Sequence, residues 1–397
     1  MISVSTAREL ILHNTKPLAA LSLPLKETAG LTLAEDLYAG HDFPPFEQSS
    51  MDGYAFCFEQ WNKQPLSIAG VVQAGATEEL VAPLSQAVRI FTGAPLPAGL
   101  DTVVMQEKVT LQNGLLYITD EELQPGTNVR PKGSEITKGS LALEAGTRLV
   151  PGAAGFIAGL GINAVHVFPK PVVSILVTGK ELQQPGKPLE YGQVYESNSY
   201  ALITALAQIG ITEVTTHVVD DDLEVLTEVI RRELLRADLI LLTGGVSVGA
   251  YDFVAQALAA CGAITIFHKI KQRPGKPLLF AKKEEKVIFG LPGNPSSVLT
   301  CYYQYVLLAI QKLMNLDQPF ITKMQVPIAT DYKRKAGLTH FLKARISNGS
   351  AVPLDGQESY KMSSFAVADC LLVLEEERSL YKKGDLVEVH LLGMRTP

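Results

Sequence analysis

The feature that most constrains the fold is a repeated alternation of strand-like and helix-like segments in the middle of the chain. Apolar, β-branched strand segments cover residues 172–179, 213–219, 238–242 and 286–291, and a helical pattern follows each of them. Such alternation predicts right-handed βαβ units and a mainly parallel sheet. Every strand-to-helix loop of such a sheet emerges at the same carboxyl edge, where open α/β sheets bind ligands. We therefore expect four turns to converge there: Thr178-Gly179, the aspartates 220–222, Thr243-Gly244-Gly245 and Pro292-Gly293-Asn294-Pro295.

The loop TGGVSVGAYD, residues 243–252, joins the third of these strands to a helix that Gly262 closes. Glycine lets a backbone approach an anionic ligand closely, and the start of a helix offers unpaired N–H groups. The loop has neither the GK[ST] ending of a Walker motif nor the GxGxxG pattern. A site for a phosphate-bearing small molecule is one hypothesis. A tight turn that uses glycine only for its geometry is the other.

Two turns in the first third of the chain also carry candidate groups. Asp52 is a lone carboxylate after Pro44-Pro45, and Gly53 allows the turn an unusual backbone shape. The alternative is an Asx turn that starts a strand. Thr92-Gly93 follows an apolar strand and is stiffened by prolines, although a rigid surface turn explains it equally well.

The densest basic run lies in residues 267–277, FHKIKQRPGKP. Beside an anion-binding edge its lysines and Arg273 would hold a phosphate or an oxyanion. The alternative is an exposed edge strand that lysines protect from pairing. Glu181, Asp221 and Asp252 follow strands at the same edge and indicate Mg²⁺, which binds one or two carboxylates plus ligand phosphates. Helix capping by Asp221 or Asp252 is the competing explanation.

Composition narrows the class of protein. The 397 residues are 47% hydrophobic and carry a net charge of −6, which argues against a general nucleic-acid binder. The four cysteines form no CxxC pair, so we expect buried free thiols in a reducing compartment. There is no HExxH or GxSxG motif. Charged residues interrupt the amino terminus, and glycine and proline punctuate the uncharged stretch 149–169, so we expect a cytoplasmic protein without a membrane span.

The predicted fold class is multidomain α/β plus β. Residues 1–43 and 139–169 form an extended linker or dimerisation region, and residues 44–138 form a β-rich lobe in which Asn113-Gly114 indicates a hairpin. Residues 170–316 form a three-layer α/β sheet domain, with Asn198 capping one helix and another helix over 298–314. Residues 317–397 form a C-terminal β-barrel-like domain.

Six motifs in chain order resemble the molybdopterin molybdotransferase family, which includes bacterial MoeA and the gephyrin E domain. They are PPFEQSSMDGYAF, IFTGAPLPAGLDTVVMQE, TNVRPKGSEITKG, TGGVSVGAYD, RPGKP and GLPGNPSS. The resemblance covers nearly the whole chain. It implies Mg²⁺-dependent insertion of molybdate into adenylyl-molybdopterin with release of AMP. It also implies an elongated homodimer whose subunits share the site, and contact with the molybdopterin adenylyltransferase.

The same resemblance assigns roles to individual residues. It implies that Asp52, Thr92, Glu181, Asp221 and Asp252 are catalytic, that the last three hold the metal, and that Glu135 matches another functional position. It also implies a set of substrate-binding residues, with Pro292 and Pro295 shaping an oxyanion loop and Ser363 and Ser364 in a loop that faces the site. This set comprises Thr178, Gly179, Thr243, Gly244, Gly245, Ser247, Gly249, Lys269, Arg273, Lys276, Pro292, Gly293, Asn294, Pro295, Ser296, Ser363 and Ser364.

Two residues depart from the family pattern. Lys180 replaces the acid of the usual Thr-Gly-Asp-Glu motif, and Lys343 stands where arginine is usual, although lysine cannot make a bidentate planar contact. Two rival functions stay open: a non-catalytic carrier of molybdopterin, and another enzyme that acts on a nucleotide pyrophosphate. The set of retained carboxylates favours the transferase over the carrier.

Overall fold

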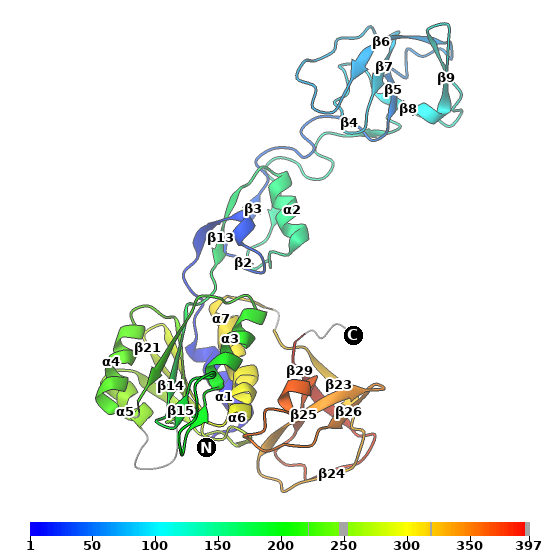
Figure 1. The fold of residues 1–397 in the computed structure, drawn as a ribbon. Helices are drawn as coiled ribbons and strands as arrows, with labels where there is room; N and C mark the ends of the chain where they lie inside the picture. The colour runs from blue at the N-terminus through cyan, green and yellow to red at the C-terminus, as the bar shows by residue number, and fades with distance from the viewer. Residues whose placement is uncertain (221, 246–252, 318–319, 394–397) are drawn as a thin grey trace. The chain divides into compact units, whose positions relative to one another are not determined.

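The computed structural model describes residues 1–397 except 221, 246–252, 318–319 and 394–397. The chain forms two compact units, residues 22–166 and residues 1–21 with 167–397. Figure 1 gives the element labels.

A six-stranded sheet forms the core of the β-rich lobe in the first unit. Its order is β8-β5-β7-β6-β10-β9, with β6 and β7 parallel and the other neighbours antiparallel. The strands are β5 (Gly53–Phe56), β6 (Leu66–Val72), β7 (Ala87–Ile90), β8 (Thr102–Met105), β9 (Val109–Gln112) and β10 (Leu115–Ile118). Asn113 and Gly114 join the last two with φ of 50° and 78°, which confirms the predicted hairpin.

The rest of this unit consists of short paired strands around one helix. One small sheet has three strands in the order β1-β13-β2, and two further sheets are the strand pairs β11-β4 and β12-β3. Their bounds are β1 (Leu21–Pro24), β2 (Thr32–Leu33), β3 (Leu37–Tyr38), β4 (Gln48–Ser49), β11 (Val129–Arg130), β12 (Leu141–Leu143) and β13 (Ala164–Phe168), with short 3-10 turns η1 (Leu25–Glu27) and η2 (Gln106–Lys108). Helix α2 (Pro151–Gly159) begins with proline at its first position, where no N–H is needed.

The second unit contains the predicted α/β sheet, in the order β17-β14-β18-β22-β21-β19. The four predicted strands are β14 (Val173–Thr178), β17 (Val214–Val219), β18 (Leu239–Thr243) and β22 (Lys286–Leu291), and all four run parallel. Strands β21 (Leu279–Lys283) and β19 (Ile264–His268) extend the sheet in antiparallel pairing. The chain passes from β14 outward to β17 and then crosses to β18, so the strand order reverses between β14 and β18.

Helices cover both faces of this sheet, as predicted (Figure 1). On one face α4 (Leu223–Glu233) and α5 (Phe253–Ala260) pack against β14, β18 and β22 through apolar side chains such as Leu226, Val254 and Ile240. The other face carries α3 (Asn198–Gln208), α6 (Pro295–Cys301), α7 (Leu307–Leu313) and the N-terminal helix α1 (Val4–Asn14). A small parallel pair, β15 (Leu182–Gln183) and β16 (Val194–Tyr195), lies in the loop after β14.

The predicted helix over residues 298–314 is confirmed, with one change of helix type. Between α6 and α7 it passes through a π-helical segment, η3 (Tyr302–Val306), whose tyrosines and Gln304 are mostly buried. Single π-helical turns inside α-helices occur often at functional sites. The sequence predicted the helix but not its π-helical segment, because periodicity does not reveal one inserted residue within an apolar helix.

A second six-stranded sheet forms the C-terminal part of this unit. Its order is β20-β25-β27-β29-β23, and β26 pairs with β25. The strands are β20 (Gln272–Arg273), β23 (Lys323–Pro327), β25 (Thr339–Ser347), β26 (Ser350–Pro353), β27 (Cys370–Leu374) and β29 (Leu386–Leu391), beside the pair β24 (Tyr332–Lys333) and β28 (Leu380–Tyr381) and the turn η4 (Phe365–Val367). One bridge joins Ile328 to Ala351. The barrel-like form and the predicted domain boundaries stay predictions.

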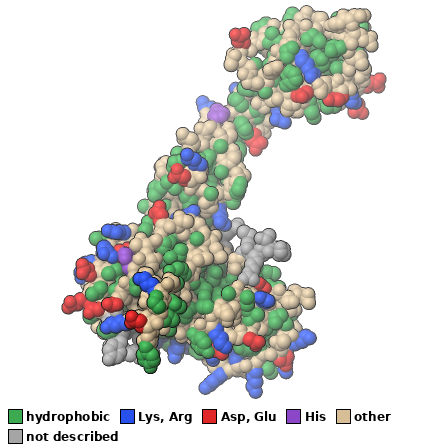
Figure 2. All heavy atoms as spheres, viewed as in Figure 1, with side chains coloured by type: hydrophobic (Ala, Val, Ile, Leu, Met, Phe, Trp, Pro, Cys, Tyr) green, Lys and Arg blue, Asp and Glu red, His purple; other side chains and the backbone are tan. Residues whose placement is uncertain are grey.

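The sequence also predicted free cysteines and no membrane span. All four cysteines are free and buried, as predicted. Among the described residues, no helix is both long enough and apolar enough to cross a membrane. Acidic and basic side chains lie interspersed on the face that Figure 2 shows.

Candidate functional site

Three strand-to-helix loops meet at the carboxyl edge of the α/β sheet. A Cβ atom added at Gly244 would lie 2.3 Å from the carbonyl oxygen of Thr178, and one added at Gly293 would lie 3.7 Å from the Cα of Gly244. Gly244 and Gly245 have φ of 86° and 64°, which favours glycine. The loops after β14, β18 and β22 therefore converge as predicted, at the point where the strand order reverses. For the fourth predicted turn, Asp220 and Asp222 do not line the cavity above these loops, and Asp221 lies outside the described residues.

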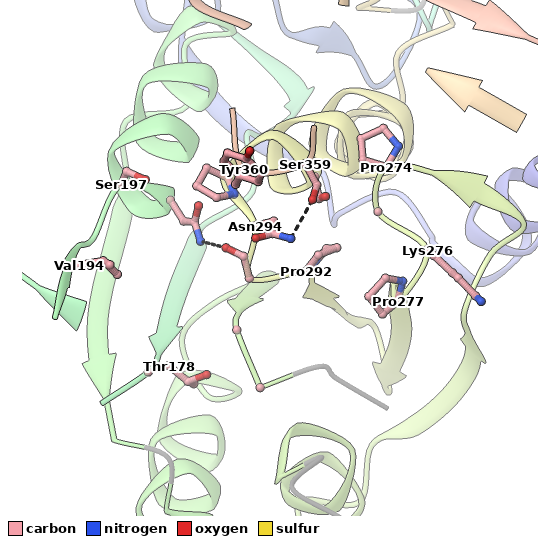
Figure 3. Close-up of a pocket in the computed structure, with 18 of the residues that line it drawn as sticks. Thr178, Val194, Ser197, Pro274, Lys276, Pro277, Pro292, Asn294, Ser359 and Tyr360 are labelled. Carbon is pink, nitrogen blue, oxygen red and sulfur yellow. Dashed lines mark hydrogen bonds between the residues drawn. The ribbon is translucent and has the colours of Figure 1, made fainter. Parts of the chain in front are cut away.

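A cavity of about 1540 Å³ opens above these loops (Figure 3). Its lining includes eleven of the predicted site residues: Thr178, Gly179, Glu181, Gly244, Gly245, Arg273, Lys276, Pro292, Gly293, Asn294 and Pro295. The charged groups in the lining are of both signs, with Lys180, Arg273 and Lys276 against Glu181, Glu196 and Glu358. The cavity therefore combines close-approaching backbone with cations that suit an anionic ligand.

Other predicted residues lie elsewhere. Thr243 and Ser296 are completely buried beneath the cavity, and Lys269 occupies the turn after β19 with a positive φ of 76°. Ser364 donates a hydrogen bond to the carbonyl oxygen of Gly356 at 2.7 Å, and neither it nor Ser363 belongs to the lining. Their parts in the site stay predictions. Asp221, Ser247, Gly249 and Asp252 lie outside the described residues.

The start of α3 differs from the prediction. Asn198 lies within the helix, and its side-chain amide donates to the carbonyl oxygen of Gly293 at 2.9 Å. Glu196 caps the helix instead, because its carboxylate accepts from the backbone N–H and the hydroxyl of Ser199 at 2.8 and 2.5 Å. Asn198 thus ties α3 to the loop after β22. Asp222 caps α4 in the same way, by accepting from Glu224 and Val225.

The C-terminal sheet supplies one wall of the cavity through residues 357–360. Asn294 donates from its side chain to the Ser359 hydroxyl at 2.9 Å, the contact drawn between them in Figure 3. The backbone N–H of Ser296 donates to the carbonyl oxygen of Ser359 at 3.0 Å. The next two N–H groups of α6 donate to Asn294, so the first turn of this helix is already hydrogen-bonded.

Lys343 holds this wall in place. Its side chain is 2% exposed, and its ammonium donates to the carbonyl oxygens of Gly356, Lys361 and Glu358 at 2.7, 3.0 and 3.3 Å. Burial lowers the pKa of Lys343 to about 8. The departure from arginine therefore has a structural account: a compact ammonium is satisfied by three converging carbonyls, where a planar guanidinium needs a flat acceptor pair.

The basic run has two structural roles. Residues 264–268 form β19, an edge strand of the sheet, as the alternative interpretation expected. Residues 273–277 instead line the cavity and present the exposed side chains of Arg273 and Lys276. Lys271 pairs with Glu376 at 2.8 Å, so it is not available to a ligand without breaking that ion pair.

Asp52 and Thr92 lie together in the other unit. Asp52 Oδ1 accepts from the backbone N–H and the hydroxyl of Thr92, at 2.8 and 2.9 Å, so the carboxylate does not form a local Asx turn. The N–H of Thr92, then its hydroxyl, lower the pKa of Asp52. Gly53 has an ordinary φ, but a Cβ there would lie 1.9 Å from the carbonyl oxygen of Val104. The close approach of β8 requires this glycine.

Glu135 is exposed in the same unit, and its backbone N–H donates a hydrogen bond to the carbonyl oxygen of Phe43.

A metal site is only partly described. Of the three predicted ligands, the structure describes Glu181, an exposed carboxylate in the cavity lining. Among the described residues no three His, Cys, Asp or Glu side chains gather into a metal-binding group. One carboxylate beside glycine-rich loops fits the way proteins bind Mg²⁺, which takes its remaining ligands from substrate and water.

Sequence reasoning missed several lining residues, among them Glu196, Asn198, Gln272 and Gln357 to Tyr360. The polar loop 180–197 was visible in the sequence, but nothing marked which of its side chains face inward. The wall at 357–360 carried no signal, because only the docking of the C-terminal sheet brings it to the cavity.

Three family models match the chain in order. They describe a MoeA N-terminal region (domain I and II) over residues 2–161, a probable molybdopterin binding domain over 174–312 and a MoeA C-terminal region (domain IV) over 325–392.

Whole proteins match as well. The molybdopterin molybdenumtransferase of Haemophilus influenzae is 34% identical over 99% of this chain and all of its own length, and that of Bacillus subtilis is 30% identical over 98% and 94%. A solved MoeA structure from Pyrococcus horikosii superposes with a TM-score of 0.82 at 30% identity, covering 98% of this chain and 99% of its own. The chain therefore belongs to the molybdopterin molybdenumtransferase family of enzymes, which acts in molybdenum cofactor biosynthesis.

Proposed function

We propose that the protein inserts molybdate into adenylyl-molybdopterin and releases AMP. The observation that carries the proposal is the cavity above Thr178, Gly244 and Gly293, in which three close-packed backbone loops face Arg273 and Lys276. Its volume of about 1540 Å³ exceeds the roughly 300–1,000 Å³ of a site for one drug-sized ligand, so it has room for a two-part substrate.

The lining residues suggest how the substrate is held. Arg273 and Lys276 would neutralise the phosphates and the molybdate dianion, with the planar guanidinium able to bind two oxygens at once. The glycines let the backbone come close to the phosphoanhydride. The reaction needs no protein nucleophile, in keeping with the absence of a hydrolase motif from the sequence.

Mg²⁺ is part of the proposal. Glu181 would hold it together with Asp221 and Asp252, and the ion would neutralise charge on the bridging phosphates. Glu181 would then orient the metal-bound phosphate, while Lys180 beside it would compete for the same negative charge. Because of this competition, we expect the protein to need a lower Mg²⁺ concentration for half-maximal AMP release when Lys180 is replaced by an acid.

Asp52 belongs to the other unit, and we propose that it joins the site of a second subunit in a homodimer. Its lowered pKa keeps the carboxylate ionised at neutral pH, so it can accept a hydrogen bond or a proton but cannot donate one. Thr92 fixes its Oδ1 through two hydrogen bonds, and Oδ2 has no hydrogen-bond partner among the residues that the structure describes. Asp52 would therefore act as an acceptor, for instance toward a water molecule.

A reconstituted assay tests the function directly. Purified protein is mixed with adenylyl-molybdopterin, molybdate and Mg²⁺, and AMP is measured by chromatography. We expect AMP release that requires both molybdate and Mg²⁺. A non-catalytic carrier would bind adenylyl-molybdopterin and release no AMP, and this result would refute the proposed transfer. The substrate would be supplied by a molybdopterin adenylyltransferase, with which we propose direct contact.

A further inference from the structure

Gln272 lies behind the cationic loop of the cavity. Its side chain is 1% exposed, and its amide nitrogen donates to the carbonyl oxygens of Pro274 and Gly275 at 3.0 and 3.2 Å. Both carbonyls belong to the loop 273–277 that carries Arg273 and Lys276. An amide that donates to two consecutive carbonyls fixes the path of the backbone between them.

Tyr305 fixes the orientation of this amide. It is completely buried in the π-helical segment, and its hydroxyl donates a hydrogen bond to the side-chain oxygen of Gln272. Burial raises the pKa of Tyr305, so the hydroxyl keeps its proton at neutral pH. Because the oxygen of Gln272 is engaged by Tyr305, its nitrogen is directed to the loop.

The loop sits tightly on this buried group. Gly275 has a φ of 85°, and a Cβ there would lie 2.6 Å from Cys301 Sγ and 2.9 Å from the amide nitrogen of Gln272. Cys301 Sγ also lies 3.7 Å from the carbonyl oxygen of Gly275. A shift of the Gln272 side chain is therefore transmitted directly to the backbone of the loop.

We propose that Gln272, oriented by Tyr305, is a positioning residue that holds loop 273–277 so that Arg273 and Lys276 face the anionic groups of the substrate. This inference rests on the proposed function. A loosened loop weakens substrate binding and leaves the reacting groups unchanged, so the effect falls on KM. We expect about a tenfold rise in KM, which corresponds to the loss of one or two ordinary hydrogen bonds.

The variant Gln272→Glu separates positioning from packing, because it keeps the shape and the acceptor for Tyr305. An ionised carboxylate cannot donate to Pro274 and Gly275, whereas a protonated one can. Since burial raises the pKa of a carboxyl group, we expect the KM for adenylyl-molybdopterin to be about tenfold above wild type at pH 8 and to approach wild type near pH 6. The kcat should stay within about threefold of wild type at both pH values.

The matched control is Gln304→Glu. Gln304 is the other buried glutamine near this position, but its oxygen accepts from Arg8 and from His390, away from the loop. This control introduces a buried carboxylate without touching residues 273–277, so its KM should equal that of wild type. A second variant, Tyr305→Phe, should raise KM several-fold without pH dependence, and it serves if Gln272→Glu does not fold.

The outcomes separate the two proposals. Wild-type protein that releases no AMP would refute the proposed function and the inference with it. If wild type is active, two results for Gln272→Glu would overturn the inference but not the proposed function. One is a KM equal to that of wild type at both pH values. The other is a change in kcat as large as the change in KM, with neither depending on pH. If only Tyr305→Phe folds, an unchanged KM in that variant overturns it.

Discussion

Replacing Lys343 with methionine tests how the wall of the cavity is held. Methionine keeps the length of the apolar stem but leaves the carbonyl oxygens of Gly356, Glu358 and Lys361 without their common donor. Each carbonyl keeps a second donor, because the Ser364 hydroxyl donates to Gly356 and Lys361 and the backbone N–H of Lys361 donates to Glu358. The variant therefore loses three hydrogen bonds to a charged group, each worth about 1.5–3 kcal/mol, and the loss of the buried ammonium returns several kcal/mol of desolvation energy. We expect a net decrease of about 2–4 kcal/mol in the free energy of unfolding at pH 7.

The difference between wild type and variant should also depend on pH. Burial lowers the pKa of Lys343 from 10.5 to about 8 in the folded protein. Between these values the unfolded chain binds the proton and the folded chain does not, so the wild-type stability rises with pH. The shift of 2.5, from 10.5 − 8, corresponds to at most about 3 kcal/mol, gained between pH 8 and 10.5.

Urea denaturation of wild type and Lys343→Met at pH 7, 8, 9 and 10 measures the difference in their free energies of unfolding. Groups that titrate equally in both proteins cancel in this difference. Hydrogen exchange of residues 356–361 reports whether the wall itself loosens. Lys361→Met is the control, because the side chain of Lys361 pairs with Glu358 at the surface and should contribute at most about 1 kcal/mol without a pH slope. A wild-type advantage that stays flat or falls from pH 8 to 10 would show that the carbonyls keep Lys343 fully charged, and the reasoning would be wrong.

Three further predictions concern the proposed reaction. Asp52→Ala should remain folded by circular dichroism and reduce AMP release at least about tenfold, because a positioned acid–base group contributes a hundredfold or more; unchanged turnover would rule out its catalytic role. Mixing Asp52→Ala with Asp252→Ala protein should restore part of the activity if two subunits share a site, and no recovery despite proven subunit exchange would place each site within one chain. Lys180→Asp should lower the Mg²⁺ concentration for half-maximal AMP release by a few-fold, since an exposed ion pair contributes only about 0–1 kcal/mol; an unchanged or higher requirement would mean that Lys180 points away from the metal.

The α/β sheet and the convergence of its loops were predictable because they follow from local rules. Apolar β-branched segments form buried parallel strands, and the direction of a parallel strand decides where its loop emerges. Thr178, Gly244 and Gly293 therefore meet as expected. The hairpin at Asn113-Gly114 was predictable for the same reason, since two adjacent residues with positive φ are needed there.

The interruption at Tyr302–Val306 and the role of Asn198 were not predictable in this way. A π-helical segment keeps the apolar composition of an α-helix, and Asn198 is as good a cap by sequence as Glu196. The choice between them depends on Gly293, which lies 95 residues away and offers a carbonyl to Asn198. Long-range hydrogen bonds of this kind override local preference.

The sequence by itself determined the strands, the glycine loops, the charges of Arg273 and Lys276 and, through six ordered motifs, the family. These depend on residue type and short spacing, which a chain displays directly. Only the tertiary structure decided that Lys343 is buried beneath residues 356–361, that Gln272 holds the cationic loop, and that Asp52 is fixed by Thr92. The partners of Lys343 and Asp52, and the Tyr305 hydroxyl that orients Gln272, come from a different part of the chain. Burial lowers the pKa of Lys343, whereas hydrogen bonds from Thr92 lower the pKa of the exposed Asp52, and folding alone creates both environments.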